Sequence, residues 1–258
     1  MDNMNIMSGV EQIPYDKVNV MQTLQEEALK ALGREKWDEI TANVEFPADN
    51  MGEEQLSHLT RELLKRFDDI VDSNISKGIF CNIKHGLKHS DFSWARERFL
   101  EYGNIDLFCA AMRRETLDGF AHAEKSGVYY HGQPVDGTVL QFVKSQPYLL
   151  YGARDKNIIK AVAIPYETQR YLKETDINKK RYYACHCPFA RESILQKEGP
   201  VSKTLCNCSL GHTKVFWEAA LNTRLNGEVK SSVLSGGQLC CFYIYLPEKI
   251  IEEYVCPK

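Results

Sequence analysis

The chain has 258 residues, of which 43% are hydrophobic and 26% are charged, and its formal net charge is −3. A chain of this length and composition predicts a folded globular protein with a sizeable core and excludes a disordered one. The small net charge argues against nucleic acid or an anionic membrane as a partner. No basic residue precedes Lys17, and the longest apolar run, residues 240–246, is too short to span a bilayer. The sequence therefore predicts a cytoplasmic protein.

The first half of the chain predicts helices. Apolar residues recur every three or four positions, and Gly33 is a stop signal after the first run. The expected helices cover residues 16–32, 37–40, 56–70, 92–99 and 105–123. Segment 81–91 combines one cysteine, two histidines and a carboxylate, but its glycine and lysines favour a junction between helices with exposed histidines. In the alternative interpretation, Lys84, His85 or His89 faces a ligand.

The composition changes near Ser126, where glycine and proline begin to separate segments rich in valine, tyrosine and phenylalanine. Such segments are typical of strands joined by turns. The sequence therefore predicts an α+β fold in two parts. A mostly helical part covers residues 1–125, and a module with an antiparallel sheet packed by helices covers residues 126–258.

Three segments of the second part predict strands. Residues 158–164 form one, and residues 228–234 and 238–247 flank a glycine pair and predict an antiparallel hairpin. Because side chains alternate along a strand, Cys240 and Cys241 should lie on opposite faces of the sheet.

Segment 181–220 holds the residues that are most clearly suited to catalysis or metal binding. They are two C-x-C pairs and two histidines, Cys185, Cys187, Cys206, Cys208, His186 and His212. Pro188 predicts a helix directly after the first pair, and an amphipathic run predicts another directly after the second. A helix N-terminus favours the thiolate and lowers the pKa of a cysteine. If the pairs meet in space, four activated sulfurs converge.

Nine cysteines, an odd number, with no export signal indicate reduced thiols rather than a disulfide framework. Converging thiolates repel one another and need a metal, a cluster or a protonated neighbour such as Arg191. Zinc is favoured, although its usual ligand spacing is wider than C-x-C, and an iron–sulfur cluster is the alternative. The other interpretation is catalytic, with Cys187 or Cys208 as nucleophile and His186 or His212 as proton carrier.

Residues 183–247 follow the order C-x-C-P, a short helix, L-C-x-C-S-x-G-H, a helix, then S-V-L-x-G-G-x-x-C-C-F-x-I-x-L-P. In this order the chain resembles the L-2-amino-thiazoline-4-carboxylic acid hydrolase-like proteins. It is similar, more distantly, to the 4-vinyl reductase ligand-binding domain. The first resemblance implies attack on a C–N or C–S bond of a small cyclic or amide-like substrate.

The second resemblance implies a zinc site on the hairpin, held by an acidic residue and a cysteine on the first strand and a cysteine on the second. The matching positions here are Lys230, Val233 and Cys241, so only Cys241 is retained. The C-x-C pairs would have to supply the missing ligands. The expected ligand set is Cys185, Cys187, Cys206, Cys208 and Cys241.

The sequence thus predicts a cytosolic enzyme that acts on a small molecule through a thiolate-rich, metal-binding site with hydrolase-like chemistry. The alternative is a non-catalytic ligand-binding or sensor module with a structural zinc site. Dithiol redox chemistry is a third option. A small-molecule substrate or ligand is the expected partner, and a homodimer is compatible with the sequence.

Overall fold

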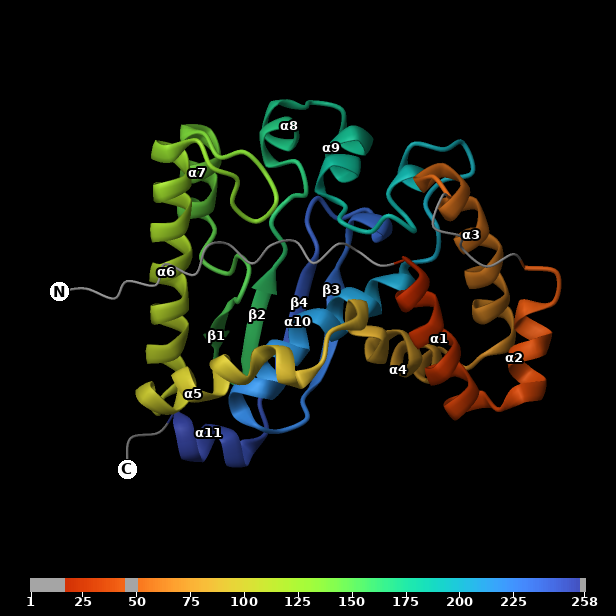
Figure 1. The fold of residues 1–258 in the computed structure, drawn as a ribbon, viewed down its shortest axis with the longest axis horizontal. Helices are drawn as coiled ribbons and strands as arrows, with labels where there is room; N and C mark the ends of the chain where they lie inside the picture. The colour runs from red at the N-terminus through yellow and green to blue at the C-terminus, as the bar shows by residue number, and fades with distance from the viewer. Residues whose placement is uncertain (1–16, 45–50, 256–258) are drawn as a thin grey trace.

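The computed structural model describes residues 17–44 and 51–255 and has the predicted α+β architecture, with a helical half followed by a four-stranded sheet and further helices (Figure 1). No helix in these ranges is long and apolar enough to cross a membrane. The helices are α1 (Lys17–Leu32), α2 (Arg34–Thr41), α3 (Glu53–Ile70), α4 (Ser73–Ile83), α5 (Ser93–Tyr102), α6 (Ile105–Ser126), α7 (Gly137–Ser145), α8 (Thr168–Lys173), α9 (Ile177–Ala184), α10 (Cys206–Leu221) and α11 (Glu248–Tyr254).

The sheet is antiparallel throughout and has the strand order β1-β2-β4-β3. Its strands are β1 (Ala153–Asp155), β2 (Ile158–Val162), β3 (Asn226–Ser231) and β4 (Cys241–Tyr245). The pairing of β3 with β4 confirms the predicted hairpin. Along β4, Phe242 and Ile244 are buried, whereas Cys241 and Tyr243 belong to the opposite face.

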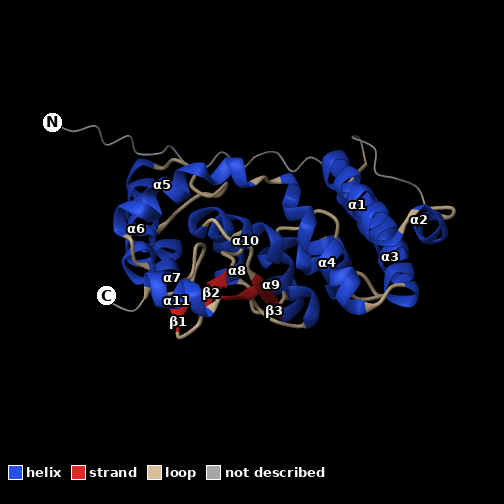
Figure 2. Ribbon diagram, turned by 90° about the horizontal axis from the view of Figure 1, so that it is seen from below, coloured by secondary structure: helices blue, strands red, loops and turns tan. Residues whose placement is uncertain are grey.

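Helix α10 lies against one face of the sheet and is buried on nearly all sides (Figures 1 and 2). Its Phe216 and Trp217 pack in one core with Ile159 of β2, Ile244 of β4 and Phe108 of α6. Its N-terminal turn belongs to a second core, formed with α1, α3 and α4. A helix that is apolar on most of its circumference must be enclosed in this way, so α10 connects the helical half to the sheet.

The helix expected directly after the first C-x-C pair does not form. Residues after Pro188 make turns and one short 3₁₀ turn, Glu192–Ile194. The backbone N–H groups of Ser193, Ile194 and Leu195 each donate to the carbonyl three residues earlier, so the segment forms tight turns instead of α-helical bonds. The Ser193 hydroxyl adds bonds to the Ala190 carbonyl and from the Val201 N–H. This alternative pairing explains why the prediction was wrong.

The helix expected directly after Cys208 begins at Cys206, before the pair ends. The Ser202 hydroxyl accepts from the Thr204 N–H and starts the 3₁₀ turn Lys203–Leu205, which leads directly into α10. The second C-x-C pair therefore lies inside a helix, and this change in local backbone redirects its side chains.

Helices α7 and α9 were not predicted from the sequence. Both begin after an aspartate, Asp136 and Asp176, whose side chain accepts hydrogen bonds from two backbone N–H groups of the first turn. Aspartate is a strong N-cap residue. The signals were present, but the frequent glycines and prolines around α7 favoured an interpretation as strands and turns.

Candidate functional site

Four histidines from four separate segments are linked electrostatically, three of them through the fourth, His186. They are His85 after α4, His131 between α6 and α7, His186 directly after α9 and His212 on α10, and we name them the histidine cluster. The rings of His85 and His212 are stacked, with centroids 4.9 Å apart. The charge of His186 acts on each of the other three, so His186 is the central member.

Burial keeps the histidine cluster uncharged at neutral pH. Desolvation lowers the pKa of His131 and of His212 to about 4, and repulsion by His186 adds to both shifts. Desolvation also lowers the pKa of His186, and it lowers that of His85 well below its ordinary value. In the described part of the chain, no carboxylate contributes to any of the four shifts.

His186 and His212 nevertheless have exposed side chains. Both imidazoles are therefore open to solvent, although neighbouring protein lowers their pKa values.

The orientation of the His186 ring is fixed by two neighbours. Its Nε2 lies 2.6 Å from the Ile164 carbonyl oxygen, and the Tyr166 ring meets it edge-on with centroids 5.3 Å apart. A carbonyl oxygen only accepts hydrogen bonds, so the geometry assigns the ring proton to Nε2 and leaves the Nδ1 lone pair available. An imidazole oriented by a third group is the usual arrangement of a general base.

Arg191, expected beside the thiols, instead supports Tyr166. Its guanidinium lies 4.7 Å from the Tyr166 ring centroid and 4.2 Å from that of Tyr182, and it forms an ion pair with Glu167. Desolvation lowers its pKa. The guanidinium therefore fixes the tyrosine that packs against His186.

A second group, which we name the thiol cluster, consists of Cys185, Cys187, Cys206 and Cys240. Burial raises the pKa of Cys185 well above its ordinary value, and the nearby charges of the other three raise it further. The backbone at Cys185 is extended. Alternation in such a segment turns Cys185 and Cys187 to one side and His186 to the other, so residues 185–187 separate the two clusters.

The second C-x-C pair does not act as a pair. Side chains that are two positions apart on a helix point in nearly opposite directions, because each residue turns by about 100°. Cys206 lies beside Ser232 and the thiol cluster, whereas Cys208 lines a small apolar cavity with Leu64 and Phe80. Cys208 therefore faces the apolar core rather than the histidines.

Cys241 lies on the opposite face of β4 from the buried Phe242, near Lys160 and Lys230. Its neighbour Cys240 is the residue that reaches the thiol cluster. Within residues 17–44 and 51–255, no group of three or more His, Cys, Asp or Glu side chains is arranged to hold a metal ion. The predicted ligand set does not fit a metal as the side chains stand, and bound zinc or an iron–sulfur cluster stays a prediction.

The expectation that these cysteines are activated is wrong for the buried members. Burial raises the pKa of Cys206, and it raises that of Cys240 to about 11. Cys206 is at a helix N-terminus, but the loss of solvation outweighs the helix dipole. These groups are therefore neutral thiols at physiological pH.

The sequence pattern indicates His186 and His212, gives His85 only a secondary role and does not indicate His131. The structure places His85, His131 and His212 within electrostatic reach of His186. The one local signal at His85 was its spacing from His89, and nothing in the sequence around His131 distinguishes it from a histidine in a turn.

Acidification from about pH 7 to pH 4 is expected to lower the free energy of unfolding. His131 has a folded pKa of about 4, below the value of about 6.5 in the unfolded chain. The unfolded chain therefore binds the proton first, and stability present above about pH 6.5 is lost until about pH 4. For His131 this loss is about 3 kcal/mol.

Urea unfolding of the wild type and of His131→Gln across this pH range checks the expectation. The variant should lose less stability on acidification, whatever its stability at neutral pH. Equal pH dependence in the two proteins would show that His131 is not held neutral by the fold.

Comparisons with protein-family models, with curated proteins and with solved structures find no match for this chain.

Proposed function

We propose that the histidine cluster is the acid–base centre of a small-molecule hydrolase. The observation that supports this most directly is His186, whose Nε2 faces the Ile164 carbonyl and whose Nδ1 is left as a base beside three further neutral imidazoles. A neutral imidazole accepts and returns a proton near neutral pH. The sequence resemblance to the aminothiazoline carboxylic acid hydrolase-like proteins adds the bond class, C–N or C–S in a small cyclic or amide-like molecule.

The proposed reaction needs one proton carrier and one water molecule. Nδ1 of His186 takes a proton from the water while the water oxygen bonds to the electrophilic carbon of the substrate. The bond from that carbon to nitrogen or sulfur then breaks, and His186 returns the proton to the departing atom. His212, the other exposed imidazole, lies within electrostatic reach of His186 and is assigned to hydrogen-bond the substrate.

The experiment is a turnover assay of the purified full chain against thiazolines, thioesters and small cyclic and linear amides, with products followed by mass spectrometry. Hydrolysis of one class by the wild type and its loss in His186→Gln would support the proposal. Equal turnover in both proteins, or no turnover of any class, would contradict it.

A second candidate function is a ligand-binding or sensor module in which the thiol cluster holds a structural metal ion. The observation that favours it is that sulfurs from three segments, after α9, at the start of α10 and before β4, lie within electrostatic reach of Cys185. Four thiolates are a common structural zinc shell. Metal binding would require the thiols to lose their protons and turn toward a common centre.

Under this candidate, protein purified without oxygen should hold about one zinc ion per chain. Cys206→Ser and Cys240→Ser should lose the metal, whereas Cys208→Ser and Cys241→Ser should retain it, because those two side chains point elsewhere. Elemental analysis of the five proteins makes the comparison. Iron with inorganic sulfide would favour a cluster instead, and absence of metal from the wild type would exclude this candidate.

A further inference from the structure

The segment that carries His85 has an unfavourable backbone. Lys84, His85 and Gly86 follow one another with φ values of 51°, 55° and 79°, all in the left-handed region. Glycine adopts this region freely, but a residue with a Cβ does not. Strained backbone of this kind persists where surrounding contacts hold it, and it is found at functional sites more often than elsewhere.

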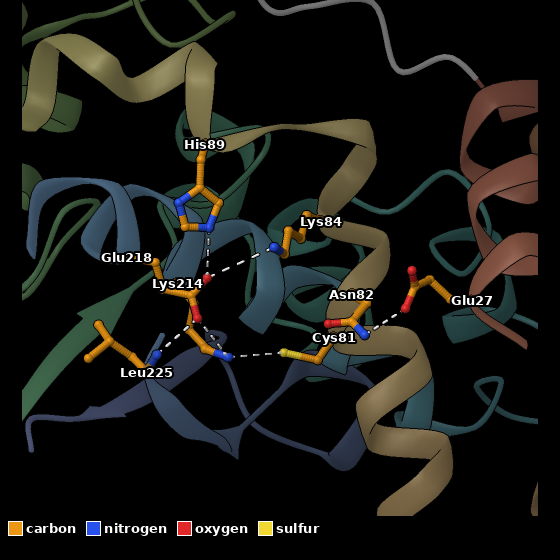
Figure 3. A network of polar contacts seen from close by, with 8 residues as sticks. All are labelled: Glu27, Cys81, Asn82, Lys84, His89, Lys214, Glu218 and Leu225. Atoms are coloured by element: carbon orange, nitrogen blue, oxygen red, sulfur yellow. Dashed lines mark hydrogen bonds and ion pairs between the residues drawn. The ribbon is translucent and has the colours of Figure 1, made fainter. Parts of the chain in front are cut away.

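The contacts that hold this turn converge on Glu218, a carboxylate that is only 4% exposed (Figure 3). Its Oε2 lies 3.9 Å from Lys84 Nζ and 3.4 Å from His89 Nε2. Its Oε1 lies 3.3 Å from Lys214 Nζ and accepts a hydrogen bond from the Leu225 N–H. Glu218 is therefore a buried carboxylate with partners on both oxygens.

Two of these partners flank His85 along the chain. Lys84 precedes it and His89 follows it four residues later, so one carboxylate on α10 holds both sides of the left-handed turn. The same helix contributes His212, whose ring stacks on that of His85. Helix α10 therefore determines both the position of the turn and the surface against which the His85 ring rests.

We propose that Glu218 is the residue that positions His85 in the histidine cluster, by pairing with Lys84 and His89 on either side of the strained turn. This inference rests on the proposed role of the cluster as the reactive centre. The partners of Glu218 described above are Lys84, His89, Lys214 and Leu225, and none of them belongs to the histidine cluster. It is a positioning residue rather than a catalytic one.

The charge of Glu218, rather than its volume, is what this role requires. Glutamine has nearly the same shape but no charge, so in Glu218→Gln the ammonium groups of Lys84 and Lys214 would lose their shared counter-charge. Two like charges near a partly buried site repel one another. The turn is then expected to move toward solvent and to relax from the left-handed region, which takes His85 away from His212.

The test is histidine-selective NMR on the full chain, because it reads the cluster without any substrate. In Glu218→Gln the contact between the His85 and His212 rings should be lost, and the pKa of His212 should rise by at least about one unit as water reaches it. Glu27→Gln is the matched control. It removes another carboxylate of the same neighbourhood, one that accepts from Asn82 at the end of α4 but does not touch the turn (Figure 3).

Unchanged ring contact and unchanged pKa values in folded Glu218→Gln would overturn the proposal, and so would an equal change in Glu27→Gln. Glu218→Asp should restore part of the contact because it retains the charge. If Glu218→Gln fails to fold, the contacts of Glu218 with Lys84 and with His89 can be removed by changing the partners instead. Lys84→Met and His89→Gln should then also raise the pKa of His212. None of these NMR measurements needs hydrolase activity, so the positioning role of Glu218 can hold or fail independently of the proposed function.

Discussion

Replacing His186 by glutamine is expected to lower the rate of hydrolysis by at least about 100-fold while the protein stays folded. Glutamine can still donate a hydrogen bond to the Ile164 carbonyl, which holds Nε2 of His186 in the wild type. It offers no basic nitrogen, so the proton transfer is lost and the local contact is kept. In the wild type, kcat/KM should stay high as the pH falls below about 6.5, because desolvation lowers the pKa of His186.

The pH profile of kcat/KM for both proteins makes the measurement, and His58→Gln is the matched control. His58 is exposed on α3 and is not a member of the histidine cluster. If kcat/KM of the wild type already fell at or above the ordinary pKa of histidine, the proposal that His186 is a desolvated base would be contradicted. A comparable loss of rate in His58→Gln would show that the effect is not specific to the cluster.

The regular elements were predictable where local pattern determines structure. The helices around residues 16–32 and 56–70 and the pairing of β3 with β4 all appear, because an apolar stripe or an alternating pattern is enough to select them. Residues 189–198 show the limit of this reasoning. Pro188 is a valid helix start, but the backbone after it pairs in three-residue turns, and the Ser193 hydroxyl ties these turns to the Val201 N–H.

The candidate site was predictable only in part, because its geometry depends on backbone form and on long-range packing. The same C-x-C spacing turns Cys185 and Cys187 to one side in an extended segment but separates Cys206 from Cys208 on a helix. The meeting of His85 with His212 depends on how α4 packs against α10. No local pattern reports such a contact, so this part of the site required the structure.

That packing leads to the second large expected effect, a loss of at least about 3 kcal/mol in the free energy of unfolding for Gly211→Ala. Gly211 lies on α10 directly before His212, and a Cβ at this position would overlap the Cys81 carbonyl of α4. The atom that blocks the Cβ belongs to the backbone of α4, so it cannot rotate away as a flexible side chain would. The two helices must separate, and the stacked rings of His85 and His212 should separate with them.

Gly78→Ala is the matched control for this prediction, because it makes the same change inside α4 at a position where a Cβ meets nothing within 4 Å. Alanine restricts the unfolded chain, so this variant should be more stable than the wild type by up to about 1 kcal/mol. Urea unfolding of the three proteins measures both effects. If Gly211→Ala were as stable as Gly78→Ala, the close approach of α4 to α10 would be wrong, and with it the geometry that brings His85 to His212.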